Sequence, residues 1–260
     1  MVFGCKKKLD DLAQAKDIKG ILHCHSTYSD GRHSLADMAA YVKSQGYQYL
    51  GITDHSQSAF YAGGLSIQKV KEQHEEIASL NKKLAPFVIF HGIESDILND
   101  GSLDYDPNTL ALFDFVIASL HAPLPRTQAE ATGRLLKAIE NPHTSILGHL
   151  TGRLLLERQA YPVDVARVIE ACGKSGVAIE LNANMFRMDL DWTWLPYAQK
   201  HHVHIAITPD AHHKEGTHAT TEGINFARKG HLNKTMTLNA MDTETLRLFF
   251  KNQKKRVKQN

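Results

Sequence analysis

Two histidines close a short apolar run near the start of the chain. Two apolar residues precede His23, and one residue separates it from His25. Alternate side chains of a strand share one face, so we expect both imidazoles to point the same way and to bind one metal ion. Asp30 follows after a short loop. Two imidazoles beside a carboxylate suit zinc, manganese or iron better than magnesium or calcium.

The same pattern returns along the chain, because later apolar runs also end on histidine, aspartate or glutamate. These runs end at His55, Glu94, His121, His149 and the segment Asp210 to His212. Independent surface histidines would not lie repeatedly at the ends of strands. In barrel enzymes the carboxyl ends of the strands share one face, and the active site is built there.

The elements that must position these residues are predicted from the spacing of apolar residues. Strands are expected at 20–25, 49–53, 87–94, 114–120, 144–148, 177–182 and 203–208, and helices at 9–19, 35–46, 66–84, 128–140, 162–173, 192–201, 220–229 and 243–251. This alternation is typical of an α/β fold with parallel strands. Seven strand and helix units favour a barrel similar to the TIM barrel, because ligands from the first, middle and last strands can meet only if the sheet curls round.

The length of 260 residues allows one large α/β domain. We expect a single domain over 1–260, with the barrel at about 20–230 and a helix with a basic tail at 240–260. The loop at 56–65 is long and rich in glycine for a turn, so we expect it to lie over the strand ends as a substrate loop.

The cysteines and the hydropathy predict where the protein works. Cys5, Cys24 and Cys172 are odd in number and scattered, which indicates no disulfide framework and suits a reducing compartment. Cys24 should face away from the two histidines beside it. No apolar run has the roughly 18 residues that a membrane span needs, so we expect no membrane association and a cytoplasmic location.

The charge of the chain is only mildly basic. A formal net charge of +2 is far below the field that would by itself indicate a nucleic-acid binder. Weak binding of acidic substrates stays open. The basic residues at 251–260 are more typical of a solvated helix end than of a binding site.

As a set, these motifs resemble the polymerase and histidinol phosphatase (PHP) family. The matching pieces are His23-Cys24-His25, Ser29-Asp30-Gly31, Thr53-Asp54-His55, Glu94, Ser119-Leu120-His121, Gly148-His149 and Asp210-Ala211-His212. Within the family, the segments 148–155 and 187–190 are most similar to the carboxyl-terminal PHP domain of bacterial family X DNA polymerases. Two positions depart from that pattern: Leu150 stands where proline is expected, and Pro209 where another small residue is expected.

The resemblance implies a distorted seven-stranded barrel, the PHP fold, that binds two or three divalent ions, zinc, manganese or iron. It implies one ion on His23, His25, Glu94 and Asp210, which would form the catalytic core, a second on Glu94, His121 and His149, and a third on Asp30, His55 and His212. Asp54 is expected either to orient a ligand or to shape a turn.

Such a centre, positively charged even after its carboxylates are counted, predicts direct hydrolysis of a phosphate ester without a covalent enzyme intermediate. Arginine presents a planar fork that matches phosphate oxygens. Arg153 and Arg187 follow strand ends and are the candidates for holding the substrate phosphate, although either could be structural.

Several functions stay open on the sequence alone. The enzyme could be a 3′–5′ exonuclease on DNA ends, associated with a DNA polymerase or with repair machinery, or a phosphatase of small molecules similar to histidinol phosphatase. It could also be a metal-stabilised module without catalysis that docks on a polymerase. An amidohydrolase is a more distant alternative, because that family also begins with two histidines on a strand but does not predict Asp30. The resemblance favours DNA ends slightly, and the oligomeric state stays open.

Overall fold

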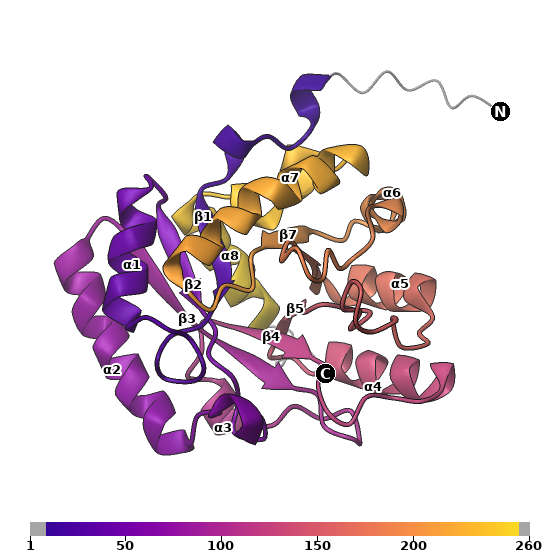
Figure 1. Ribbon diagram of the computed structural model, residues 1–260, viewed down its shortest axis with the longest axis horizontal. Helices are drawn as coiled ribbons and strands as arrows, with labels where there is room; N and C mark the ends of the chain where they lie inside the picture. The colour runs from indigo at the N-terminus through magenta and orange to yellow at the C-terminus, as the bar shows by residue number, and fades with distance from the viewer. Residues whose placement is uncertain (1–8, 255–260) are drawn as a thin grey trace.

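Seven parallel strands pair in chain order and form the centre of the molecule (Figure 1). The structure is a computed structural model that describes residues 9–254. The strands are β1 (Gly20–Cys24), β2 (Tyr49–Ile52), β3 (Val88–Asp96), β4 (Phe115–Ser119), β5 (Thr144–Leu147), β6 (Ala178–Asn182) and β7 (Ile205–Thr208). Because every pairing is parallel, all carboxyl ends point to the same side of the sheet.

The two outer strands come back together just beyond their ends. The backbone N–H of His25 donates to the carbonyl of Ala211 at 2.9 Å, and the N–H of Ala211 donates to the carbonyl of His23 at 3.2 Å. Bonds between the first and the last strand close the sheet on the side where the predicted ligands lie. The predicted seven-stranded barrel is therefore confirmed.

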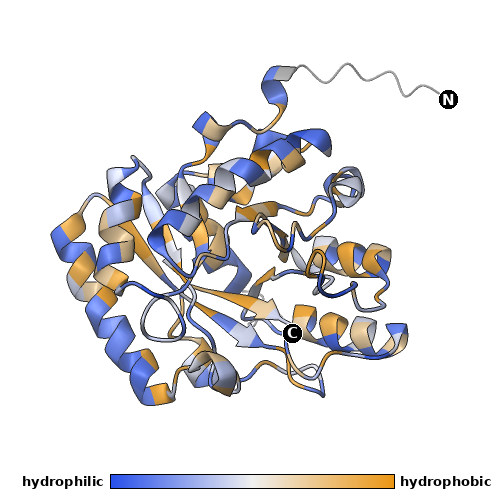
Figure 2. Ribbon diagram, in the orientation of Figure 1, coloured by the Kyte–Doolittle hydropathy of each residue, from blue (hydrophilic) through white to orange (hydrophobic). Residues whose placement is uncertain are grey.

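Helices surround the barrel on its outer face, and Figure 2 shows α2 hydrophilic over most of its length while the strands are largely hydrophobic. The helices are α1 (Leu35–Ser44), α2 (Ile67–Leu84), α3 (Pro107–Leu110), α4 (Gln128–Glu140), α5 (Val165–Ser175), α6 (Leu195–Lys200), α7 (Ala219–Lys229) and α8 (Thr243–Lys254). Ser34 and Ser66 cap α1 and α2, because each side chain accepts a hydrogen bond from a backbone N–H of the first turn.

Aromatic side chains fill the barrel end that lies opposite the predicted ligands. Phe115 stacks on Phe250 of α8 with ring centroids 4.8 Å apart, and Phe90 meets the same ring edge-on at 5.8 Å. Tyr49 is buried beside them and donates its hydroxyl to the carbonyl of Met241 at 3.1 Å. Each such buried ring contributes about 1.5–3 kcal/mol of stability. The apolar packing thus lies at the amino ends of the strands, and the carboxyl ends hold polar groups.

The predicted helix at 9–19 is wrong. Two short 3-10 turns, η1 (Leu9–Asp11) and η2 (Ala15–Asp17), lie there instead. Besides the local bonds of these turns, the segment bonds to distant parts of the chain: Ala13 N–H donates to the carbonyl of Leu232 at 2.9 Å, and Lys19 N–H to the carbonyl of Asn239 at 2.8 Å. These long-range partners replace the local bonds that a helix needs.

The other predicted elements are confirmed with small shifts at their ends. The predicted helix at 192–201 begins as a 3-10 turn, η4 (Trp192–Trp194), before α6. The short α3 was not predicted; the carboxylate of Asp106, the residue before it, caps it. Residues 255–260 of the basic tail and Cys5 lie outside the described residues. Within 9–254, no helix is long and apolar enough to cross a membrane.

Candidate metal centre

The structure brings all nine predicted ligands together at the carboxyl ends of the strands. Six of the side chains are buried, His121 and His212 are half-buried, and Asp30 lies at the surface. Three groups among them offer ligand atoms within 4.8 Å of one another. The groups are His25, Asp30, His55 and His212; His23, His25 and Asp210; and His55, Glu94 and His121.

Glu94 lies at the centre of the cluster. Its Oε1 lies 2.9 Å from Nε2 of His149 and 3.4 Å from Nε2 of His121. Its Oε2 lies 3.1 Å from Nδ1 of His55 and 3.4 Å from Nε2 of His23. Nε2 of His25 lies 3.7 Å from Oε2 as well, so one carboxylate faces five imidazoles on two sides, which is the arrangement of a bridging ligand.

The geometric groups differ from the ligand sets that the resemblance implies. His25 belongs to two groups, one with Asp210 and one with Asp30. His55 lies near Asp30 as expected, but it also lies near Glu94. The rings of His25 and His55 stack with centroids 4.5 Å apart, so the three sets overlap in space. The division of the nine side chains among individual ions stays a prediction.

Three of these residues have a left-handed backbone. The φ angles are +62° at His23, +49° at Asp210 and +21° at His149. β1 is thus not regular to its end, and its pairing with β2 shifts between Ile21 and Cys24. His23 and His25 still reach the same cluster, with ring centroids 5.3 Å apart. Such angles cost about 1–3 kcal/mol each and persist where the surroundings force them, mostly at functional sites.

Asp54 holds the loop that carries Asp30. Its carboxylate accepts hydrogen bonds from the backbone and hydroxyl of Ser26 at 2.8 and 2.7 Å and from the hydroxyl of Ser29 at 2.5 Å. A further bond comes from Gln73 Nε2 at 2.6 Å. Asp54 therefore ties the end of β2 to this loop, which fits both roles predicted for it.

Glu180 of β6 is a buried residue of the site that the sequence analysis missed. Its carboxylate accepts the proton of His23 Nδ1, so that Nε2 of the same ring faces the cluster. It also accepts from the Thr208 hydroxyl at 2.6 Å and from the backbone N–H of His149 at 2.6 Å. Such a partner determines the orientation of the imidazole and which nitrogen is left for a metal.

Two more polar residues support ligands from behind. Asp96 lies 2.6 Å from Nδ1 of His121, and Asn182 donates to Asp210 Oδ2 at 3.1 Å. The signal for them was present in the sequence, because Asp96 follows Glu94 by two positions and Asn182 follows Glu180 by two. In a strand this spacing puts both side chains of a pair on one face, here the interior of the barrel.

The electrostatics of the cluster favour ionised carboxylates. Burial alone would raise the pKa of Glu94 and of Asp210, but nearby imidazoles, foremost His23, hold both pKa values well below the usual range. Burial lowers the pKa of His55 to about 4, so this ring is neutral at pH 7 and able to bind a metal. At His121 burial acts in the same direction, but Glu94 and Asp96 together outweigh it and raise the pKa to about 10. A metal bound there displaces a proton.

The residues present fit a group of metal ions. Nε2 of His23, both ring nitrogens of His25, and Nδ1 of His55 and of His149 are buried without a hydrogen-bond partner among the described residues. An unsatisfied buried nitrogen is costly, and native proteins rarely keep one. Several of them around two ionised carboxylates form a donor set for divalent transition metals.

The two arginines have different surroundings. Arg153 donates through Nε to the carbonyl of Arg187 at 2.9 Å, through Nη2 to the carbonyl of Met188, and through Nη1 to Asp191 at 3.2 Å. Its guanidinium is thus used to hold the loop after β6. Arg187 lies on that loop, with Nε 3.3 Å from Oδ2 of the candidate ligand Asp210. Of the two, Arg187 is the one beside the metal cluster.

Cys24 is buried in an apolar cluster with Leu35 and Met38 of α1, so it faces away from the centre as predicted.

Comparisons with known proteins agree with this geometry. A model of the PHP domain matches residues 22–184. The chain is 41% identical over 241 residues to the "DNA polymerase/3'-5' exonuclease PolX" of Bacillus subtilis, and the match covers 93% of this chain and 42% of that protein. It is 30% identical over 207 residues to a probable phosphatase of Caldicellulosiruptor saccharolyticus, covering 74% of this chain and 79% of the phosphatase. The chain thus spans less than half of the Bacillus relative.

A solved structure shares the fold. The histidinol phosphate phosphatase of Lactococcus lactis, in a complex with zinc, L-histidinol and phosphate, superposes with a TM-score of 0.58 over 80% of this chain and 94% of that one. The sequence identity is 18%, so this likeness shows the fold alone.

Proposed function

Since this chain belongs to the PHP family, we propose that it is a metal-dependent phosphoesterase that acts as a 3′–5′ exonuclease on DNA ends. The observation that carries the phosphoesterase chemistry is the convergence of nine histidine and carboxylate side chains at the barrel mouth. The choice of DNA ends is supported by the 41% identity to the Bacillus protein over nearly the whole chain.

The nine side chains would hold two or three ions, and His23, His25, Glu94 and Asp210 would form the catalytic core. Divalent ions held there would activate a water for attack and would neutralise the charge of the phosphate oxygens. Glu94 lies among five imidazoles and would hold them around one carboxylate. Glu180 holds the proton of His23 on Nδ1 and leaves Nε2 directed at the centre.

Arg187 is the candidate for holding a substrate phosphate. Apart from the contact of Nε with Asp210, no hydrogen bond of its guanidinium is found within residues 9–254. Its terminal nitrogens are thus able to bind two phosphate oxygens at once. Arg153 acts through the loop, because its bonds to the carbonyls of Arg187 and Met188 determine where Arg187 lies. Both predicted arginines keep a role in substrate binding, one direct and one indirect.

A phosphatase of small molecules is the second candidate function. It is favoured by the probable phosphatase of Caldicellulosiruptor, of which the match covers 79%. The metal cluster alone does not choose between the two substrates, because a phosphomonoester and a phosphodiester present the same oxygens. For the exonuclease, we propose a DNA polymerase or a repair complex as partner. The name of the Bacillus relative combines a DNA polymerase with a 3′–5′ exonuclease.

Shortening of a single-stranded oligonucleotide tests this proposal. With Mn²⁺ we expect a 5′-labelled strand to lose nucleotides from its 3′ end. Each phosphate contact outside the centre should add about 0.7 to the slope of log affinity against log salt, so cleavage should weaken steeply between about 50 and 200 mM salt. A strand that stays intact with zinc, manganese and iron, while a sugar phosphate is cleaved, would replace the exonuclease with the phosphatase. Cleavage of neither substrate would contradict both.

A further inference from the structure

Two pairs of exposed apolar side chains lie in the loops around the metal cluster. The first platform is Phe60 and Tyr61, which lie in the 3-10 turn η3 (Phe60–Ala62) after β2 and are 85% and 67% exposed. The second platform is Met185 and Phe186, which lie in the loop after β6 and are 70% and 61% exposed. Exposed apolar side chains that gather beside a candidate site are typical of a binding surface.

The first platform adjoins one end of the cluster. The ring centroid of Tyr61 lies 6.2 Å from that of His121 and 6.3 Å from that of His55. The loop that carries it is well anchored, because Ser58 donates its backbone N–H to Asp104 at 2.6 Å and its hydroxyl to Asp96 at 3.0 Å. Tyr61 is therefore held next to the candidate metal ligands with much of its ring in solvent.

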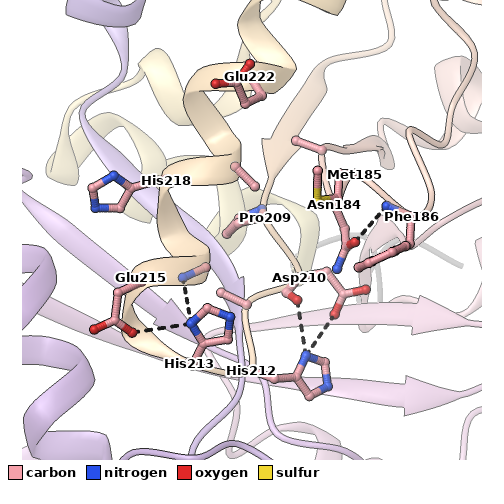
Figure 3. A pocket seen from close by; sticks show the side chains of 14 residues that line it. Asn184, Met185, Phe186, Pro209, Asp210, His212, His213, Glu215, His218 and Glu222 are labelled. Carbon is pink, nitrogen blue, oxygen red and sulfur yellow. Dashed lines mark hydrogen bonds and ion pairs between the residues drawn. The ribbon is translucent and has the colours of Figure 1, made fainter.

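The second platform forms one wall of a pocket of about 370 Å³ at the other end of the cluster. The candidate ligands Asp210 and His212 line the same pocket, and Figure 3 shows Phe186 near Asp210. Phe186 is anchored by its backbone, which donates to Asn184 Oδ1 at 3.0 Å and accepts from Leu155 at 2.6 Å. The pocket thus opens directly onto the metal cluster.

The charges of this pocket suit the end of a strand. Glu215 and Glu222 line it, and Figure 3 shows Glu215 on the opposite side from Phe186. These carboxylates disfavour a further backbone phosphate in the pocket, and the three histidines of its lining include His213, whose Nδ1 lies 3.3 Å from Glu215. A neutral base, with amine and ring nitrogens that can bond to carboxylates, is accepted there. The pocket therefore fits a terminal nucleoside.

The presence of two platforms, one at each end of the cluster, favours a phosphodiester substrate over a phosphomonoester. A small phosphomonoester has one organic group and would need one platform. A phosphodiester inside a nucleic acid has a nucleoside on each side of the phosphorus, and each base has a face that stacks on aromatic side chains. Candidate ligands lie between the platforms. The ring centroid of His55 lies 6.3 Å from that of Tyr61 and 6.1 Å from that of His212, and His212 lines the pocket of the second platform.

We infer that the two platforms bind the two unpaired bases on either side of the scissile phosphodiester. The second platform takes the 3′-terminal base, and the first platform takes the base before it. Water adds to the phosphorus, the bond from phosphorus to the 3′ oxygen of the preceding nucleotide breaks, and that oxygen takes a proton. The products are a nucleoside 5′-monophosphate and a strand with a new 3′ hydroxyl. This assignment rests on the proposed exonuclease and names its substrate as a single-stranded end.

Oligonucleotides that lack one base test the inference. Three single strands of equal length are compared: an intact strand, one with an abasic 3′-terminal nucleotide, and one with an abasic nucleotide before it. For the unmodified enzyme, loss of either base should lower kcat/KM by about 5- to 150-fold, the range expected for one stacking contact. Phe186→Ala should abolish the discrimination at the terminal position, and Tyr61→Ala should abolish it at the preceding position.

Matched variants separate stacking from other effects. Tyr61→Phe keeps the ring and should keep the discrimination. Leu248→Ala removes an exposed apolar side chain of α8, at the amino ends of the strands, and should keep both preferences. The inference is overturned if the intact strand is cleaved without preference for either base, or if the two alanine variants discriminate as the unmodified enzyme does. Failure to cleave the intact strand at all would instead overturn the proposed exonuclease.

Discussion

Replacing Glu94 with glutamine is expected to lower turnover by at least about 100-fold at saturating metal. The substitution keeps the shape of the side chain but removes the charge that faces four imidazoles at 2.9–3.4 Å. A neutral amide is a poor bridge between metal ions, so the effect should exceed that of losing His212, a half-buried ligand at the edge of the cluster. Turnover is measured with the same phosphate ester for each variant.

Glu170→Gln is a matched control for this substitution. Glu170 accepts a hydrogen bond from the Tyr197 hydroxyl at 2.6 Å on the outer face of the barrel, so its loss should leave turnover unchanged. Circular dichroism establishes that both variants are folded. Near-normal turnover of folded Glu94→Gln would mean that this carboxylate is not a bridge.

Replacing Arg187 with alanine is expected to raise KM by about 10- to 150-fold, the range for one hydrogen bond to a charged group. Its metal content should change little, because arginine does not ligate metals. The physical reason is the position of the guanidinium beside Asp210, where its terminal nitrogens can reach a phosphate. KM for the oligonucleotide and the metal content of the purified variant are measured together.

Arg153→Ala separates direct from indirect binding of phosphate. This variant loses the bonds that hold the loop after β6, so it should raise KM and also lower the melting temperature. Arg187→Ala should leave the melting temperature nearly unchanged. An Arg187→Ala enzyme that keeps its KM but loses metal would show that the arginine supports Asp210 and does not bind the phosphate.

The barrel and the composition of the cluster were predictable because both depend on short segments of the sequence. Apolar runs mark the strands, and a histidine or carboxylate directly after a run must lie at the carboxyl end of a parallel strand. His121 and His149 are of this kind, since each follows its strand by two positions. Their convergence then follows from closure of the sheet.

The parts that could not be predicted depend on long-range contacts. Glu180 lies inside β6 and not at its end, and only the folded barrel brings it under His23. The left-handed backbone of His23 is likewise set by its surroundings, because bonds from the neighbourhood of Ala211 fix the end of β1. The predicted helix at 9–19 failed for the same reason, as its backbone bonds to remote residues.

The central claim is that the nine side chains at the barrel mouth hold catalytic metal ions. Elemental analysis of protein purified without added metal, and again after reconstitution, tests it most directly. The account predicts two or three ions of zinc, iron or manganese per chain, and fewer after Glu94→Gln, because both oxygens of this carboxylate face candidate imidazole ligands. Less than about one ion per chain in the reconstituted protein would contradict it.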